Sequence, residues 1–282
     1  MKIKKFSIFV PGTCGELIQG RIDGKDFLVT APINLFSVAT ITQIDKNTEF
    51  NGLGWKAQRA IEIFSERYNI RIEGVSLNLT SNIPRGKGMA SSSADISSVL
   101  YALDKYFGPF LSPSEIADIA IEIEPTDGVM FPGIVAFDYM RGTFWEYIGK
   151  PFPLKVLVLD FGGEIDTLEF ERPIPDEEFS SYLLENLKKA FQERDMGLFG
   201  KIITENTIEN QKILSKEQCK ALIEEVLKLG AVGVNMAHSG TVCGIYTPYS
   251  KKDDVDKIRG LFPSASFLGW YDFVGGGHLF EI

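Results

Sequence analysis

The sequence predicts an α+β protein built from two domains. The first 45 residues are rich in the apolar and β-branched side chains that strands favour. From residue 54 onward apolar residues also recur at helical spacing, and residues 149–153 form a proline-containing break. With 282 residues the chain is long enough for two domains of ordinary size. We expect residues 1–150 to form an N-terminal domain and residues 151–282 a C-terminal domain.

The N-terminal half contains segments with the hydrophobic pattern of strands and segments with the hydrophobic spacing of helices. The apolar run before Pro11-Gly12 is too short for a signal peptide and is typical of a first strand. Asp23-Gly24 is a turn signal, and Ser112 with Glu115 has the pattern of a helix capping box. We expect, in order, strands within 1–45, a helix at 54–68, a strand at 75–79, a glycine-rich loop at 81–88, helices from Ala90 and from Ser112, and strands at 134–139 and 143–148.

The C-terminal half opens on a predicted strand at 155–161. Pro151 and Pro153 cannot continue the interior of a sheet, so the segment before this strand is the best linker. Ser215 and Gln218 form a second candidate capping box. We expect helices at 176–194, 195–214 and 215–229, a strand at 241–246, a short helix at 253–261 and strands to the end.

Composition narrows the function classes. Hydrophobic residues make up 44% and charged residues 24%, as in ordinary globular proteins, and the net charge is -9. An acidic surface repels phosphate backbones, so we expect no nucleic-acid partner. No segment approaches the roughly 18 apolar residues of a membrane span, so we expect no membrane partner. Cys14, Cys219 and Cys243 lack metal-ligand spacing, which favours reduced thiols and a cytoplasmic location.

A glycine- and serine-rich segment lies between a predicted strand and a predicted helix. Glycine lets a backbone approach an anion closely, and a helix N-terminus offers unpaired N–H groups and a positive dipole end. Serine hydroxyls can donate to phosphate, and one can also bind Mg²⁺. We therefore expect this segment to bind the phosphates of a nucleotide. It comprises Pro84, Arg85, Gly86, Lys87, Gly88, Met89, Ala90, Ser91, Ser92 and Ser93.

The alternative for this segment is an ordinary tight turn before a serine-capped helix. The segment is not a Walker A loop, and Ser91 replaces the third glycine of the dinucleotide fingerprint. However, Arg85, Lys87, the glycines and three serines occur together at one strand–helix junction, which favours phosphate binding.

The segment resembles the nucleotide motif Pro-x-x-x-Gly-Leu-Gly-Ser-Ser-Ala of the GHMP kinases, named for galactokinase, homoserine kinase, mevalonate kinase and phosphomevalonate kinase. Met89 stands in place of the leucine and Ala90 in place of the middle glycine. Residues 11–20 resemble the N-terminal motif of that family, and residues 235–244 resemble its glycine-rich third motif. Order and spacing also agree, so the resemblance spans most of the chain.

The resemblance implies a fold and an activity. The N-terminal domain is expected to be S5-like with a left-handed β-α-β crossover, and the C-terminal domain ferredoxin-like. ATP and a small-molecule substrate would meet in the cleft between them. The γ-phosphoryl group would pass directly to a hydroxyl, with Mg²⁺ and loop amides stabilising charge.

Glu124 and Asp127 are the candidate catalytic carboxylates, together with Ser92. Acidic residues at a helix C-terminus are unfavourable, which favours function over the alternative of solvated helix-end charges. A kinase needs a carboxylate for Mg²⁺ and can use another to orient the hydroxyl or accept its proton. The resemblance implies Glu124 as a metal ligand, with Ser92 beside it, and Asp127 as the residue that faces the hydroxyl.

The first and third motifs supply the candidate substrate-binding residues. Glu16 and Gln19 could meet a substrate amine or carboxylate, or could be polar residues on a strand surface. Cys14 could be a pocket thiol, although a small buried packing residue fits better. His238 could be a general base, although a donor that fixes its loop fits better. The set is Cys14, Gly15, Glu16, Gln19, His238, Ser239 and Gly240.

The motifs are most similar to those of members that phosphorylate L-threonine for cobalamin side-chain synthesis, so we expect L-threonine to become O-phospho-L-threonine. Homoserine or another small alcohol is the alternative acceptor. A non-catalytic nucleotide- or metabolite-binding regulator is the alternative of another class. Thr13 stands where the mevalonate kinase branch has a catalytic lysine, so a mechanism using that lysine is not expected. We expect a small amino acid or alcohol as the partner and allow for a homodimer.

Overall fold

Two long strands, β1 (Lys5–Ile22) and β2 (Lys25–Gln43), pair antiparallel at the centre of the larger sheet. The turn between them, Asp23-Gly24, has positive φ at both residues, as a two-residue hairpin of type I′ requires. The computed structural model describes residues 5–45, 47–162, 176–209, 216–237 and 240–282.

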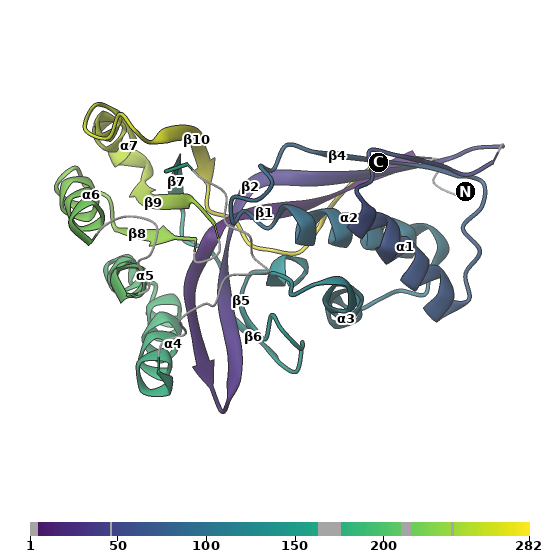
Figure 1. Cartoon of the computed structure of the whole chain (residues 1–282), viewed down its shortest axis with the longest axis horizontal. Coiled ribbons are helices and arrows are strands. Elements are labelled where there is room, and N and C mark those ends of the chain that lie inside the picture. Colours follow the sequence, from purple (N-terminus) through teal and green to yellow (C-terminus); the bar gives the residue numbers. More distant parts are fainter. Residues whose placement is uncertain (1–4, 46, 163–175, 210–215, 238–239) are drawn as a thin grey trace.

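The first strand does not end at Pro11-Gly12. β1 continues, and its register with β2 shifts between Pro11 and Thr13 and twice more before Ile18. Such irregularities bend a strand and increase its twist. Figure 1 shows the bend: β1 and β2 leave the helices of the N-terminal half and turn toward those of the C-terminal half.

The larger sheet has the strand order β11-β1-β2-β4-β3, and β5 and β6 extend from β2. β3 and β4 are parallel neighbours, and α1 (Trp55–Tyr68) lies between them in sequence, so the three form a β-α-β crossover. Its left-handedness stays a prediction. α2 (Ser91–Phe107) packs on β1 and β2, beside α1 and α3 (Pro113–Ile123). The remaining strands are β3 (Glu49–Asn51), β4 (Val75–Ser81), β5 (Ile134–Phe137), β6 (Trp145–Gly149) and β11 (Leu279–Glu281).

The second sheet has four strands in the order β10-β7-β9-β8, and all neighbours are antiparallel. This is the strand order of a ferredoxin-like β-α-β-β-α-β unit. Its elements are β7 (Leu154–Asp160), α4 (Glu177–Glu193), α5 (Met196–Glu209), α6 (Lys216–Lys228), β8 (Gly233–Met236), β9 (Val242–Pro248), α7 (Lys252–Val255) and β10 (Ser266–Asp272).

Alternation along β7 divides the apolar packing into two clusters. Val156 and Val158 point into the large cluster that also contains the N-terminal sheet and α4 and α5. Leu157 and Leu159 point to the opposite face, into a smaller cluster with α6 and α7. Because both faces of β7 are covered, the strand is a near-continuous apolar run.

The predicted two-domain α+β fold is confirmed, and most elements lie where the pattern placed them. The predicted final helix is shorter, since α7 passes into a 3-10 segment at Asp256–Gly260. β3 and β8 were not predicted from the sequence, and the capping box at Ser215 lies outside the described residues. The division at 150/151 stays a prediction, while β11 pairs with β1 in the larger sheet. Of the helices in the described ranges, none has the length and apolar character needed to cross a bilayer.

Candidate active site

The loop between β4 and α2 turns through three residues with positive φ: Gly86 at 69°, Gly88 at 77° and Ala90 at 55°. The turn places the first residues of α2 at the mouth of a cavity of about 330 Å³. Among the described residues, the cavity is lined by Gly54, Trp55, Lys56, Ala57, Arg85, Gly86, Gly88, Met89, Ala90, Ser91, Ser92, Ser93, Asp95, Glu124, Pro125 and Asp127. Eight of the ten predicted nucleotide-binding residues and both catalytic carboxylates therefore surround one cavity.

Ala90 adopts a left-handed backbone conformation, which explains why the family motif has a glycine at this position. It is the N-cap of α2, with φ 55° and ψ 30°. A left-handed conformation costs a residue with a Cβ about 1–2 kcal/mol, a cost that glycine avoids. The alanine therefore keeps the geometry of the motif at the expense of some backbone strain.

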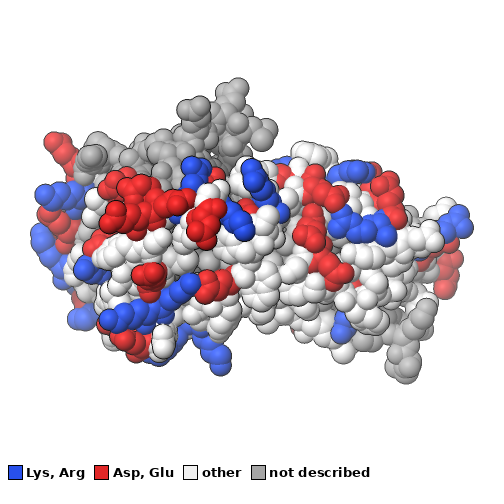
Figure 2. Space-filling view, turned by 90° about the horizontal axis from the view of Figure 1, so that it is seen from below, with Lys and Arg blue, Asp and Glu red and all other residues white. Residues whose placement is uncertain are grey.

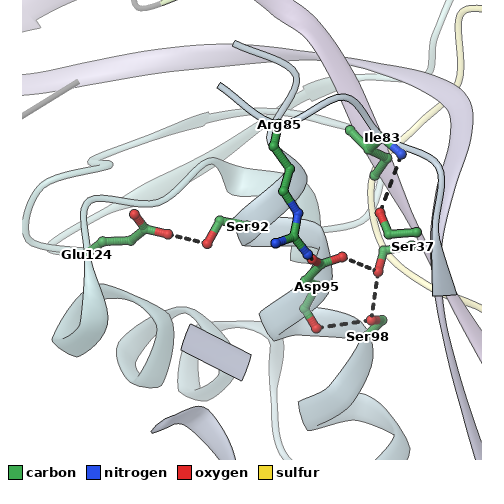
Figure 3. A network of polar contacts seen from close by, with 8 residues as sticks. Ser37, Ile83, Arg85, Ser92, Asp95, Ser98 and Glu124 are labelled. Atoms are coloured by element: carbon green, nitrogen blue, oxygen red, sulfur yellow. Dashed lines mark hydrogen bonds and ion pairs between the residues drawn. The ribbon is translucent and has the colours of Figure 1, made fainter. Parts of the chain in front are cut away.

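Glu124 is the C-cap residue of α3, and it lies across the cavity from the start of α2. Ser92 Oγ donates to Glu124 Oε1, as Figure 3 shows, and Lys56 Nζ from the first turn of α1 donates to Glu124 Oε2. Three helix ends thus converge on one carboxylate, and each of its oxygens has a partner.

Asp127 is held next to Glu124 by contacts to Ser93, the third serine of α2. Its backbone N–H donates to Ser93 Oγ over 3.0 Å, and Thr126 Oγ1 lies 2.9 Å from the same hydroxyl. Ser93 and Thr126 are buried, so these bonds fix the turn that carries Asp127. The sequence analysis assigned Ser93 to phosphate binding, whereas the structure also gives it this positioning contact.

Arg85 reaches the cavity beside a buried carboxylate (Figure 3). Its Nη2 lies 3.4 Å from Asp95 Oδ2, and Ser37 Oγ donates to Asp95 Oδ1 over 2.6 Å. Burial raises the pKa of Asp95, against the opposing effects of the Ser37 hydrogen bond and the charge of Arg85. The ion pair directs a largely exposed guanidinium over the loop.

Three segments that are distant in sequence meet behind the loop. Thr13 N–H donates to Met89 O and Gly15 N–H to Gly88 O, each over 3.0 Å. From the third motif, Thr241 N–H donates to Lys87 O over 3.2 Å. The backbone of the phosphate loop is therefore bound both to β1 and to the C-terminal half.

Gly88 and Gly240 are required by packing at this junction. A Cβ on Gly88 would lie 2.6 Å from Ala237 Cβ, and one on Gly240 would lie 2.2 Å from Lys87 O. By contrast, a Cβ on Gly86 would meet nothing within 4 Å. The sequence analysis assigned both loop glycines to close approach of an anion, but the geometry makes Gly88 a contact between segments, although it also lines the cavity.

Lys87 and Pro84 do not line the cavity. Lys87 Nζ lies 3.1 Å from Asp160 Oδ2 at the end of β7, and Thr241 donates its hydroxyl to the other oxygen of that carboxylate. Lys87 thus ties the loop to the second sheet, and its predicted contact with the nucleotide phosphates stays a prediction.

The predicted substrate residues of the first motif lie below the surface. Cys14 is fully buried, its pKa is raised by burial and by Glu16, and a Cβ on Gly244 would come within 2.8 Å of its sulfur. This burial favours the packing role that was the alternative interpretation of Cys14. Glu16 and Gln19 are also buried, and Gln19 Nε2 donates to Tyr139 OH over 3.4 Å.

Of the other predicted substrate residues, Gly15 and Gly240 lie in the described part of the chain and do not line the cavity. Gly15 packs its positive-φ backbone against Ala237, and Gly240 packs against Lys87. His238 and Ser239 lie outside the described residues. The substrate assignments therefore stay predictions, and the geometry of the described part of the chain favours a packing role for Cys14, Gly15 and Gly240.

Trp55 and Lys56 are cavity residues that the sequence analysis missed. They begin α1, and 67% of Trp55 is exposed. The available signal was Lys56 itself, because a cation in the first turn of a helix opposes the dipole. That signal had no partner in local sequence, since Glu124 is 68 residues away.

Acidic and basic side chains are interspersed over the face shown in Figure 2. With a net charge of -9, the chain attracts an anion only through local groups. The two helix N-termini and Arg85 at the cavity are such groups.

Comparisons with known proteins agree with this geometry. Residues 56–133 match the GHMP kinases N terminal domain, and residues 187–261 match the GHMP kinases C terminal domain. A 4-diphosphocytidyl-2-C-methyl-D-erythritol kinase of Clostridium tetani is 30% identical over 254 residues, which cover 83% of this chain and 87% of that protein. The chain belongs to the GHMP kinase family.

Two further relatives place this GHMP kinase among known members. An L-threonine kinase of Salmonella typhimurium is 28% identical over 257 residues, which cover 89% of this chain and 85% of that protein. The homoserine kinase structure from Cytophaga hutchinsonii is similar with a TM-score of 0.74 at 15% identity, covering 99% of this chain and 98% of that one. The latter likeness shows the fold.

GHMP kinases are phosphotransferases that act on hydroxyls of small molecules, with ATP as the phosphate donor. The donor set at the cavity fits the Mg²⁺ that such a reaction implies. Mg²⁺ prefers oxygen ligands and commonly takes one or two carboxylates together with substrate phosphates. Ser92 and Glu124 offer a hydroxyl and a carboxylate in contact. Within the described ranges no cluster of three or more acidic, His or Cys side chains forms, so the phosphates would supply further ligands.

Proposed function

We propose that this GHMP kinase transfers the γ-phosphoryl group of ATP to the hydroxyl of L-threonine, producing O-phospho-L-threonine and ADP for cobalamin side-chain synthesis. The observation that carries the catalytic part is the contact between Ser92 and Glu124 at the start of α2, next to Asp127. The choice of L-threonine rests on the wording of the motifs and on the L-threonine kinase relative.

Each residue has a distinct task in this proposal. The N–H groups at the start of α2 and the backbone of Gly86 receive phosphate oxygens. Ser92 and Glu124 would hold Mg²⁺, which supplies positive charge to the phosphates. Asp127 orients the acceptor hydroxyl and takes its proton as the oxygen–phosphorus bond forms and the bond to the β-phosphate oxygen breaks.

A panel of acceptors tests the proposal. ADP release is measured with L-threonine, L-homoserine, L-serine, mevalonate and 4-diphosphocytidyl-2-C-methyl-D-erythritol, the last because of the 30% identical relative. We expect the highest kcat/KM with L-threonine. A site that pairs the amine and the carboxylate rejects mevalonate, which leaves the amine partner unpaired, whereas L-serine and L-homoserine differ only in their carbon skeleton and are expected to be disfavoured by about 10- to 200-fold. Parallel reactions without any acceptor measure the ADP that ATP hydrolysis releases without transfer.

Two outcomes would contradict the proposal in different ways. A higher kcat/KM with another acceptor would replace L-threonine and keep the kinase. ATP binding without ADP release in the presence of any acceptor would favour a nucleotide-binding regulator.

A further inference from the structure

The ion pair between Lys56 and Glu124 joins two residues of the same cavity. Lys56 Nζ donates to Glu124 Oε2 while Ser92 Oγ donates to Oε1, so both carboxylate oxygens are already in use. The side chains are 32% and 22% exposed, which leaves the pair open to solvent and to a ligand in the cavity. It is therefore a contact that an arriving ligand can exchange.

Lys56 is placed where its own helix disfavours it. It stands in the first turn of α1, which contains no acidic residue, and the positive end of the helix dipole lies there. The N-terminus of α2 faces the same cavity. Two positive helix ends and an ammonium group thus share one space, and such an arrangement is favourable only when negative charge accompanies it.

Glu124 alone cannot neutralise the positive charge in the cavity if its carboxylate also binds a metal ion. A carboxylate that ligates Mg²⁺ directs an oxygen lone pair to the ion, and its negative charge is then shared with the ion. The attraction that holds Lys56 is weakened by the same step. With a nucleotide bound, the ammonium group would share the cavity with the phosphates, whose negative charge could then attract it.

We propose that Lys56 is an exchangeable counter-ion: it holds Glu124 in place while the cavity has no nucleotide, and it moves to the β- and γ-phosphate oxygens when Mg·ATP binds. This inference rests on the proposed function, because it takes Glu124 as the metal ligand and the cavity as the phosphate site. Lys56 thereby contacts the nucleotide itself and supplies charge at the group that is transferred.

The test measures nucleotide affinity by isothermal titration for the Lys56→Gln and Lys56→Arg variants. The ligands are a nonhydrolysable ATP analogue, ADP and AMP, each with Mg²⁺. We expect Lys56→Gln to weaken the analogue and ADP by about 10- to 100-fold, as the loss of a charge-assisted hydrogen bond does, and AMP by less than about threefold. Lys56→Arg keeps the charge and is expected to recover most of the affinity.

Arg59→Gln is the matched control. Arg59 lies on the same helix, pairs with Glu62 and does not line the cavity, so its loss is expected to leave all three affinities unchanged. Thermal unfolding of each variant shows whether it is folded. If Lys56→Gln does not fold, Lys56→Met, which preserves the shape of the stem, replaces it.

Two results would overturn the inference. If Lys56→Gln loses affinity for AMP and for the ATP analogue equally, Lys56 is a structural link between α1 and α3. If Lys56→Gln binds the analogue with unchanged affinity, Lys56 has no role at the phosphates. Both results leave the acceptor panel unaffected. Failure of the wild-type chain to bind the analogue would overturn the proposed function and this inference together, whereas binding without transfer to L-threonine would overturn the proposed acceptor alone.

Discussion

Glu124 shows how far a single residue can be interpreted from sequence. Its place at the end of a predicted helix was visible, and a negative charge there is disfavoured by the helix dipole. The structure supplies the compensation, since Ser92 and Lys56 both donate to the carboxylate. Sequence indicated the first partner through the motif, but the second is 68 residues away and becomes a neighbour only when α1 and α3 pack together.

Glu124→Gln and Asp127→Asn are expected to fail in different ways. A hard cation needs a charged oxygen ligand, so Glu124→Gln weakens Mg·ATP binding by at least about tenfold and also slows transfer. Asp127→Asn keeps the shape but removes the proton acceptor, so it leaves Mg·ATP affinity within a few fold and lowers kcat by about 10²–10⁴. Titration calorimetry with a nonhydrolysable analogue, beside steady-state kinetics, separates the two effects.

The opposite assignment of roles has a clear signature. If Asp127→Asn loses Mg·ATP binding while Glu124→Gln keeps it, the two tasks are exchanged. Near-normal kcat in both variants would make the pair solvated helix-end charges.

Among the elements, α3 is the one whose start could be predicted most sharply. The capping box is present: Glu115 N–H donates to Ser112 Oγ over 3.3 Å, and Ser112 N–H donates to Glu115 Oε2 over 2.8 Å. Such bonds are local, so the residues that make them are neighbours in sequence. β8 had no comparable signal, because four residues become a strand only through pairing with β9.

Ser112→Ala is expected to lower the free energy of unfolding by about 0.5–2 kcal/mol at pH 7, the usual loss for an N-cap. The hydrogen bonds from the Ser112 backbone and side chain lower the pKa of Glu115. Because the pKa of Glu115 is lower in the folded state, the carboxylate stabilises the fold at pH values above its unfolded-state pKa of 4.5. This stabilisation is lost as the pH falls through the folded-state pKa. The difference in the free energy of unfolding between wild type and variant is therefore expected to shrink as the pH falls below 4.5 in denaturant titrations.

Ser114→Ala is the control for this measurement. Ser114 follows in the first turn of the same helix but is not the cap residue. An equal loss of stability in both variants at every pH would contradict the assignment of the effect to the capping box.

At the scale of the whole molecule, the sequence predicted which segments matter but not how they meet. The three motifs were visible in order, and the family resemblance placed a nucleotide between two domains. The contacts of Lys87 with Asp160 and of Gly88 with Gly240 could not be predicted, because they depend on how the second sheet packs behind the loop. A homodimer stays a prediction.

Asp160→Asn is expected to loosen this junction and lower the free energy of unfolding by about 1.5–3 kcal/mol at pH 7, the range for hydrogen bonds to a charged group. Burial would raise the pKa of Asp160, but the Thr241 hydroxyl, the Gly162 N–H and Lys87 outweigh it and lower the pKa. The ionised Asp160 therefore stabilises the fold at pH values above its unfolded-state pKa of 3.8. This stabilisation is lost as the pH falls through the folded-state pKa. Chemical unfolding at pH 7 and near pH 3 measures both.

Asp254→Asn is the matched control, because Asp254 on α7 also has a lowered pKa but forms an exposed ion pair with Lys257 of the following 3-10 segment. We expect little change in its unfolding, since solvent screens exposed ion pairs. Equal effects of the two substitutions would show that the Asp160 junction is no stronger than a surface pair.

The junction behind the loop also has a consequence for biosynthesis. The loop backbone bonds through Met89 to Thr13, 76 positions earlier, and through Lys87 to Thr241, 154 positions later, so its final shape depends on two long-range contacts. Contacts of such long range form late, because closing a long loop is entropically unfavourable. A nascent chain on the ribosome would thus have no complete ATP site until residue 241 has emerged and packed. Cellular ATP would then bind finished molecules selectively and, at about 100 times its dissociation constant, stabilise them by about 2.7 kcal/mol.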